Sequence, residues 1–183
     1  TNDTTGHSNT DGVQFGYQNS AGAYIWNFEN TDIYFGTNNN TRMTIDNDGY
    51  VTAPNTPSFL AVGMSGASYD NGTMTGAGAG ASYNIGNHYN GSTGIFTAPV
   101  SGRYLCGCGV LVQNGSGRLE GHISKNNTQT VANFNGTGTT YDGPCCSAVV
   151  QLSANDTLRV KRQSGNAYDP DHGNHYFYAH LLG

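Results

Sequence analysis

Hydrophobic and polar residues alternate along most of this chain with a period of two, which is the period of a β-strand. Each alternating run is short and is bounded by turn-forming residues such as Gly22 and Gly49. No window places apolar residues at helical spacing, because Gly, Asn and Thr interrupt every candidate, so we predict essentially no helix. The large alternating residues near the start of the chain are Val13, Phe15, Tyr17, Tyr24, Trp26, Phe28, Ile33, Phe35, Met43 and Ile45.

The longest apolar stretch is residues 94–112, which reads GIFTAPVSGRYLCGCGVLV. We interpret it as one long strand with two apolar faces. Tyr104 lies with both cysteines on one face, and Gly107 and Gly109 lie between leucines on the other. Glycines in a strand let another backbone or an aromatic ring come close. Because both faces are apolar, we expect one to meet a second sheet and the other to be covered, most simply by a neighbouring subunit.

Further alternating segments follow at the spacing that is typical of a β-sandwich, with Gly- and Asn-rich turns between them. We therefore expect an all-β protein. The predicted strands of this part are residues 58–62, 118–125, 130–134, 145–152, 157–162 and 176–182.

The best domain boundary is the segment Ala53–Pro57, where two prolines three positions apart favour an extended connector. It divides the chain into residues 1–56, which are rich in β-strand pattern and aromatic side chains, and residues 57–183, which carry the longer strands. We expect these to be separate domains.

The composition excludes several classes of partner. Charged residues make up only 10% of the chain and the formal net charge is −5. The only cationic cluster is Arg159, Lys161 and Arg162, which alternates within one predicted strand, so we expect no nucleic-acid partner. No apolar stretch approaches the roughly 18 residues of a membrane span, so we expect no membrane insertion. Since the chain does not begin with Met, we expect it to be a fragment or a processed piece.

The four cysteines are Cys106, Cys108, Cys145 and Cys146. In strands the first two point the same way and the last two point opposite ways, which is a poor arrangement for a disulfide framework. Buried free thiols that act as small apolar residues and a single bridge between the pairs remain open. The spacing is also a poor match to a zinc site.

Motifs for enzymatic chemistry are missing. Residues 63–67 lack the second glycine of a GxSxG nucleophile turn, and no HExxH or phosphate-binding loop occurs. The only glutamates are Glu29 and Glu120, and most aspartates lie in predicted turns, so no pair of carboxylates suggests a glycosidase. Asp46–Gly49 resembles the start of a calcium loop but lacks the downstream glutamate, and we predict a turn there. We expect no catalysis, no cofactor and no metal.

The aromatic residues of the first domain need partners. Four or five strands of about 17 Å cannot bury such large rings within one chain. Three identical chains wound about an axis would bury the rings and leave the Asn and Thr faces in water. The alternative is a small, flexible sheet packed on the following domain. For the homotrimer, the predicted interface residues of the whole chain are Phe15, Trp26, Phe28, Phe35, Tyr104, Gly107, Gly109, Phe177 and His180.

Residues 57–183 resemble the complement C1q globular-head family, a branch of the tumour-necrosis-factor-like jelly rolls. The resemblance rests on three landmarks in order: TGIFTAPVSGRYLCGCGVLV at 93–112, VVQLSANDTLRVKRQSG at 149–165 and HYFYAHLLG at 175–183. Pro57-Ser58-Phe59 is similar to the family's opening strand. The resemblance implies a two-sheet jelly-roll head of ten strands that forms compact trimers and binds ligands without catalysis.

Residues 33–51, IYFGTNNNTRMTIDNDGYV, resemble a segment common in bacteriophage tail fibres, where it forms a trimeric β shaft. A shaft followed by a trimeric head implies the distal end of a viral fibre, located on the virion outside the host cell. The expected function is attachment to a host-surface glycan or outer-membrane receptor as a multivalent homotrimer, with other tail proteins joined through the missing N-terminus. The alternatives are a secreted C1q-like adhesion or signalling head and a tailspike polysaccharide depolymerase.

One loop between the last two predicted strands concentrates acids, histidines and a tyrosine. Asp can accept hydrogen bonds from sugar hydroxyls and Tyr can stack on sugar rings, so the loop is a candidate contact patch for a glycan or a divalent ion; the alternative is a polar hairpin loop. The candidate ligand-binding residues are Tyr168, Asp169, Asp171, His172, Asn174 and His175.

Overall fold

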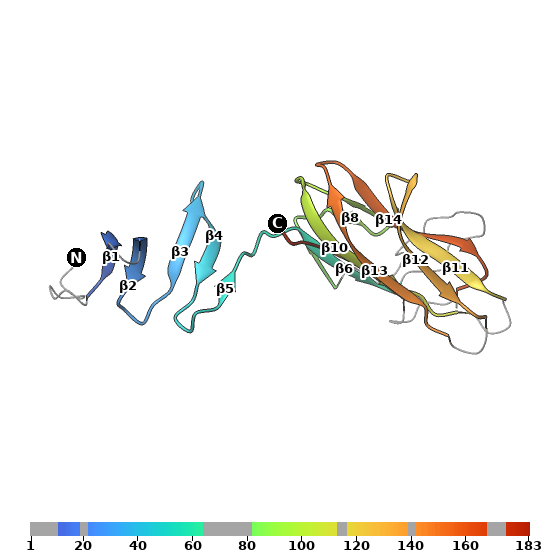
Figure 1. Ribbon diagram of the computed structural model, residues 1–183, viewed down its shortest axis with the longest axis horizontal. Helices are drawn as coiled ribbons and strands as arrows, with labels where there is room; N and C mark the ends of the chain where they lie inside the picture. The colour runs from blue at the N-terminus through green and yellow to red at the C-terminus, as the bar shows by residue number, and fades with distance from the viewer. Residues whose placement is uncertain (1–10, 19–21, 64–81, 113–116, 139–141, 168–174) are drawn as a thin grey trace. The chain divides into compact units, whose positions relative to one another are not determined.

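The computed structural model describes residues 11–18, 22–63, 82–112, 117–138, 142–167 and 175–183 (Figure 1). The chain forms two compact units, Thr1–Asn55 and Thr56–Gly183, which we call unit 1 and unit 2. All regular elements of the described residues are β-strands, as the period-two alternation predicts.

Unit 1 contains two small antiparallel sheets. The hairpin of β1 (Val13–Gln18) and β2 (Gly22–Asn27) forms the first, and β3 (Ile33–Thr37), β4 (Asn40–Ile45) and β5 (Val51–Thr52) form the second.

Local turn chemistry shapes the second sheet of unit 1. Asn38 and Asn39 join β3 to β4 with φ of 49° and 56°, the left-handed values that a tight hairpin turn requires. In the turn between β4 and β5, an Asp46 carboxylate oxygen accepts the backbone N–H groups of Asp48 and Tyr50 at 3.0 and 2.8 Å. The predicted turn at the apparent calcium loop is therefore confirmed, because the Asp46 side chain caps its own turn.

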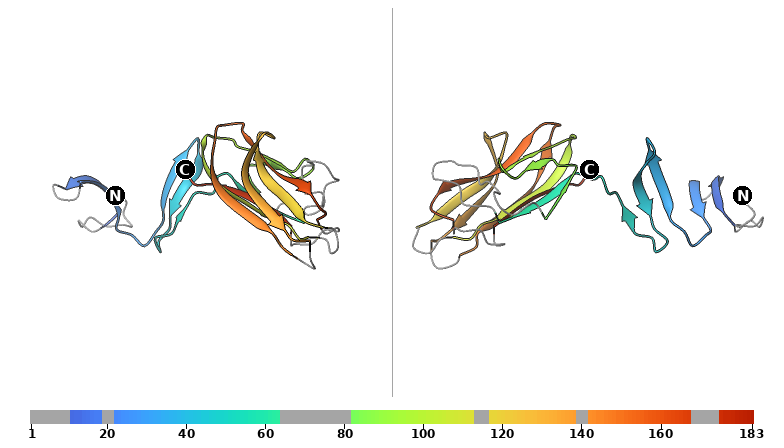
Figure 2. Two further views of the ribbon diagram at one scale, coloured as in Figure 1. Left: turned by 45° about the vertical axis from the view of Figure 1, so that its right-hand side comes forward. Right: turned by 180° about the vertical axis from the view of Figure 1, so that it is seen from behind.

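Unit 2 is a sandwich of two five-stranded antiparallel sheets (Figure 2). Its strands are β6 (Ser58–Val62), β7 (Tyr83–Ile85), β8 (Tyr89–Asn90), β9 (Ile95–Thr97), β10 (Gly102–Gly109), β11 (Leu119–Lys125), β12 (Gln129–Gly136), β13 (Cys145–Leu152), β14 (Thr157–Ser164) and β15 (Tyr176–Leu181). Sheet I has the order β13-β10-β15-β6-β7, and sheet II has the order β12-β11-β14-β9-β8.

The prediction of one long strand over residues 94–112 is wrong. The stretch divides into β9, which pairs with β8 and β14 in sheet II, and β10, which pairs with β13 and β15 in sheet I. Pro99 lies in the break and has no N–H to offer a ladder. Ala98 is held just before it, because its N–H donates to Asp156 O at 2.8 Å and its carbonyl accepts from Asn155 N at 2.7 Å. The chain thus crosses from one sheet to the other inside its most apolar segment.

The core lies between the two sheets of unit 2 and is organised around Phe59. Its ring stacks on Tyr89 and Phe96, with centroids 4.3 and 5.1 Å apart, and meets Phe177 edge-on at 5.0 Å. Phe59 and Phe177 belong to sheet I, and the other two rings belong to sheet II, so the cluster joins the layers. Each such aromatic pair contributes roughly 0.5–1.5 kcal/mol beyond its burial. Burial also raises the pKa of Tyr89 to about 12.

Candidate functional site

The outer face of sheet I carries many apolar side chains beside a few polar ones such as Arg103 and Gln151, although no other part of the described chain covers it as a layer. Alternation along β10 sends Tyr104, Cys106 and Cys108 into the core, so Leu105, Gly107 and Gly109 face outward. A two-layer sandwich normally presents polar side chains on such a face. We call this surface the outer face of sheet I; its apolar members are Leu60, Val62, Tyr83, Leu105, Val149, Tyr176 and Tyr178.

Two tyrosines of β15 lie over the two glycines of β10. Tyr178 pairs with Gly107 and Tyr176 pairs with Gly109 in the antiparallel register. A Cβ added at either glycine would overlap the opposite ring, which shows how closely the rings approach the backbone. The two rings stack with centroids 6.3 Å apart and an interplanar angle of 15°. Burial is the main cause that raises the pKa of both phenols, so both are neutral at physiological pH.

The rest of the outer face offers apolar side chains to solvent. Val149 on the edge strand β13 is 57% exposed and Tyr83 on β7 is 44% exposed. Leu60, which lies between Tyr178 and Tyr83 in the register, is half-buried. Monomeric soluble proteins rarely leave a contiguous apolar patch of this kind uncovered. His180 marks the end of the face and is exposed.

Four of the predicted interface residues need correction. The side chains of Tyr104 and Phe177 are fully buried in the core, so neither can contact another subunit. Tyr104 donates its hydroxyl to Val100 O at 2.9 Å. Gly107 and Gly109 are themselves buried, because tyrosines of the same chain cover them. The outward surface at this place consists of the rings of Tyr176 and Tyr178, which are not among the predicted interface residues.

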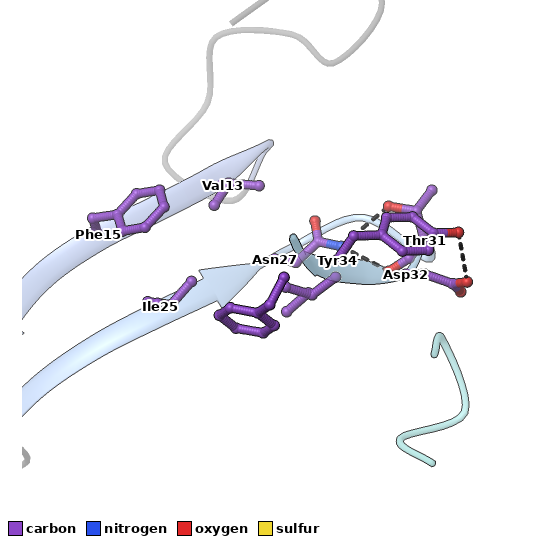
Figure 3. A pocket seen from close by; sticks show the side chains of 9 residues that line it. Val13, Phe15, Ile25, Asn27, Thr31, Asp32 and Tyr34 are labelled. Atoms are coloured by element: carbon purple, nitrogen blue, oxygen red, sulfur yellow. Dashed lines mark hydrogen bonds between the residues drawn. The ribbon is translucent and has the colours of Figure 1, made fainter. Parts of the chain in front are cut away.

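Unit 1 exposes aromatic side chains on one side of its hairpin. Val13, Phe15 and Ile25 line a hollow of about 520 Å³ together with residues of β3 (Figure 3). Phe15 is 76% exposed, and Phe35 from β3 lines the same hollow at 37% exposure. The structure therefore brings two of the predicted interface residues together in one apolar depression.

Hydrogen-bonded polar side chains line one end of this hollow. Asn27 Nδ2 donates to the carbonyl of Thr31 at 2.7 Å, and the Tyr34 hydroxyl donates to an Asp32 carboxylate oxygen at 2.8 Å (Figure 3). The hydrogen bond to the Asp32 anion raises the pKa of Tyr34. The other Asp32 oxygen accepts the backbone N–H of Asn47 at 3.1 Å, which ties this end of the hollow to the turn after β4.

The opposite side of the hairpin is also aromatic. Trp26 and Phe28 lie with ring centroids 6.2 Å apart, and Trp26 is 57% exposed. The Tyr24 ring covers Gly16 of the neighbouring strand. A two-stranded ribbon with apolar side chains on both faces cannot form a core by itself.

The candidate ligand loop is only partly described. Residues 168–174, which carry five of the six predicted ligand residues, lie outside the described residues. His175 directly precedes β15 and is 1% exposed, with its carbonyl accepting from Gly63 N at 2.8 Å. His175 is therefore part of the buried framework, and its role as a ligand contact stays a prediction.

A separate polar hollow of about 430 Å³ lies beside β8 and β9. Asn87 and His88 contribute to it from the turn before β8, and Thr97 and Thr157 contribute from the paired ends of β9 and β14. Its complete lining is Asn87, His88, Asn90, Thr93, Ile95, Thr97 and Thr157.

The described part of the chain shows neither a metal-binding cluster nor a membrane-spanning helix. Its His, Cys, Asp and Glu side chains form no group of three or more that could hold a metal ion. The described residues also contain no helix with the length and apolar character of a membrane span.

The comparisons with known proteins decide the family of unit 2. The C1q domain profile matches residues 59–182. The chain belongs to the C1q domain family. C1q/TNF-like domains form trimers and are typically extracellular binding or structural modules without enzymatic activity. A search of the curated proteins found no match.

Solved structures show the same fold for this C1q domain. The globular domain of zebrafish complement 1qA is 18% identical, with a TM-score of 0.54 over 69% of this chain and 98% of that chain. Murine APRIL at pH 5.0 is 16% identical, with a TM-score of 0.57 over 69% and 99%. Eiger TNF from S. frugiperda is 13% identical, with a TM-score of 0.57 over 70% and 93%. At these identities the likeness shows the fold alone.

Proposed function

We propose that this chain is the distal part of a bacteriophage tail fibre, which attaches the virion to a host surface as a homotrimer. The observation that carries the proposal is the outer face of sheet I, where Tyr176 and Tyr178 lie over glycines and present a flat apolar surface. A second and third copy of the same chain are the partners that this face fits, because C1q/TNF-like domains form trimers.

The tyrosine rings suit a subunit contact for a physical reason. A ring held flat against the backbone by a glycine loses little rotational freedom when a partner arrives, so association orders few side chains. Tyrosine also contributes a large apolar area, and aromatic side chains concentrate at the centres of interfaces. We expect the trimer to bury more than about 2,000 Å² in total.

Unit 1 supports the fibre rather than a secreted signalling head. Its hairpin carries exposed aromatic residues on both faces, among them Phe15 and Trp26, and its sequence over 33–51 resembles tail-fibre shaft segments. Three copies wound together would cover these rings, as a trimeric shaft does. The secreted adhesion or signalling head remains the second candidate, because the C1q-like fold of unit 2 would serve it equally well.

The binding mechanism is multivalent. Three identical sites on one rigid trimer multiply weak contacts into avidity gains of roughly 10² to 10⁴ when the geometry lets all three engage. We place the contacts with a host glycan or outer-membrane receptor on loops, with Tyr168, Asp169, Asp171, His172 and Asn174 as candidates. The hollow that contains Asn87 and His88 is a further candidate for sugar hydroxyls.

Sedimentation of the purified chain tests the assembly. We expect three times the mass of one chain, and Val149→Glu should lower the mass toward the monomer because it places a charge on the outer face of sheet I. Asn133→Glu is the matched control, since Asn133 is exposed on β12 of sheet II. A wild-type monomer contradicts the trimer, and equal masses for both variants contradict the role of the outer face of sheet I in forming it.

A binding assay separates the fibre from its alternatives. Fluorescently labelled protein is incubated with a panel of bacterial cells and with animal cells, and isolated envelope polysaccharide is assayed for new reducing ends. We expect binding to particular bacteria and no new reducing ends. Binding to animal cells alone favours the secreted head, and cleavage of the polysaccharide favours a depolymerase.

A further inference from the structure

Two of the four cysteines face each other across neighbouring strands of sheet I. Cys108 on β10 and Cys146 on β13 are direct partners in the antiparallel register. Their sulfur atoms are 3.6 Å apart. Directly opposed residues of antiparallel strands have Cα atoms about 4.5 or 5.5 Å apart, and both values lie within the range of about 4.4–6.8 Å that disulfides occupy. The spacing of directly opposed strand residues is therefore compatible with a bond between these sulfurs.

The other two cysteines do not compete for this pairing. Cys106 lies opposite Ala148, and its Sγ is 3.5 Å from the Ala148 carbonyl oxygen, to which it donates. Cys145 lies opposite Gly109 and is exposed on the outer face of sheet I. Because neighbouring residues of a strand point to opposite faces, the side chain of Cys145 is directed away from Cys108.

The two facing thiols differ in their environment. Cys108 is fully buried, whereas Cys146 is half-buried near the edge of the sheet, on its outermost strand. The hydrogen bond between the two thiols lowers the pKa of Cys146, and the same hydrogen bond, together with burial, raises the pKa of Cys108. Cys146 is therefore the more accessible thiol and the first to ionise.

We infer that Cys108 and Cys146 form an intrachain disulfide in an oxidising medium, with a small disulfide such as oxidised glutathione as the oxidant. The Cys146 thiolate attacks one sulfur of oxidised glutathione, forms a mixed disulfide and releases one glutathione thiolate. Cys108 then loses its proton and attacks the Cys146 sulfur, which releases the second glutathione thiolate. Two protein thiols are oxidised, one glutathione disulfide is reduced to two thiols, and the two protons pass to the glutathione.

The bond would fasten the edge strand β13 to β10. It would close the loop of residues 109–145, which includes β11 and β12, and so would restrict the unfolded chain more than the folded one. We expect the midpoint of thermal unfolding to rise by about 10 °C on oxidation. The inference concerns unit 2 alone and does not depend on the proposed function.

The experiment compares reduced protein with protein incubated with oxidised glutathione, and includes a sample refolded in a glutathione redox buffer so that access to the buried thiol is not limiting. Alkylation in denaturant followed by mass spectrometry should find four reactive cysteines before oxidation and two afterwards. Peptide mapping without reductant should link the peptide of Cys108 to that of Cys146.

Three variants make the result specific. Cys146→Ala should abolish both the cross-linked peptide and the rise in midpoint, whereas Cys106→Ala and the exposed Cys145→Ser should retain both. Four reactive cysteines in the refolded sample would overturn the inference, because access to the thiols cannot then explain their survival. A cross-link that involves Cys145 or Cys106 in place of Cys146 would overturn it as well.

Discussion

Units 1 and 2 contain similar strand patterns, but they differ in whether their large aromatic side chains are buried or exposed. In unit 2, Phe59 and Phe177 are fully buried between two five-stranded sheets. In unit 1, the two sheets have two and three strands, and Phe15 and Trp26 are 76% and 57% exposed. Among the described residues, every buried hydrophobic side chain belongs to unit 2. Alternation of apolar and polar residues is enough to form a strand. A hydrophobic core also requires a second layer of strands that is large enough to cover the apolar face.

The largest expected effect separates a core phenylalanine from an exposed one. Phe59→Ala should destabilise unit 2 by about 3–5 kcal/mol, because it removes the ring that joins the two sheets and leaves a cavity. Phe15→Ala should leave the unfolding of unit 2 unchanged, because Phe15 belongs to unit 1. Denaturant unfolding measures both, and similar losses in both variants would show that the contrast between the units is wrong.

The second prediction asks whether partner chains complete unit 1. In a lone chain, removal of the exposed Phe15 ring would change little, but in a wound trimer it should loosen the shaft. We expect Phe15→Ala to speed proteolysis within residues 1–55 by about tenfold. The control is Thr41→Ala, an exposed position of β4 in the same unit. Equal cleavage rates for wild type, variant and control would indicate that no partner covers the hollow.

The third prediction concerns the outer face of sheet I. Gly107→Ala places a methyl group where the Tyr178 ring lies, so the ring must move and the surface proposed for the trimer must change. We expect a loss of about 1–3 kcal/mol in stability and weaker association, measured by thermal unfolding and by sedimentation over a range of concentrations. Gly143→Ala is the matched control, because nothing lies within 4 Å of its added Cβ. Equal stability and equal association of the two variants would mean that the Tyr178 ring is not held against Gly107.

The smallest expected effect concerns the pH dependence of stability and contrasts an aspartate of unit 1 with one of unit 2. Asp46 caps its own turn in unit 1, whereas Asp156 in unit 2 joins distant segments by accepting from Asn126 at 2.7 Å and from Lys125 at 2.8 Å. The hydrogen bond from Asn126 is the main cause that lowers the pKa of Asp156 to about 2.

Because the folded pKa of Asp156 is lowered from 3.8, its stabilisation is present above about pH 4 and is lost as the pH falls toward 2. The urea midpoint of unit 2 should therefore fall over this window by more in the wild type than in Asp156→Asn, and Asp46→Asn in unit 1 should behave like the wild type. If the urea midpoints of wild type and Asp156→Asn fall equally as the pH is lowered, the Asp156 carboxylate does not cause the pH dependence.

Much of the fold can be predicted from the sequence because strand alternation and turn residues are local signals. The segments around Val13, Tyr24 and Cys145 form strands where the pattern indicates, and Asp46 caps a turn where a turn is predicted. Pairing is not a local signal. The glycines at 107 and 109 and the tyrosines at 176 and 178 share the same spacing, but only the antiparallel register of β10 and β15 places ring over glycine.

By itself, the sequence determined that the chain is all-β, where most strands lie, which faces are apolar and which family the second unit resembles, since these follow from residue order and period. Only the tertiary structure decided that the stretch around Pro99 crosses between sheets, that Tyr104 and Phe177 lie inside, and that His175 is buried. The physical reason is that burial depends on which layer covers a face, and that layer comes from strands distant in the chain.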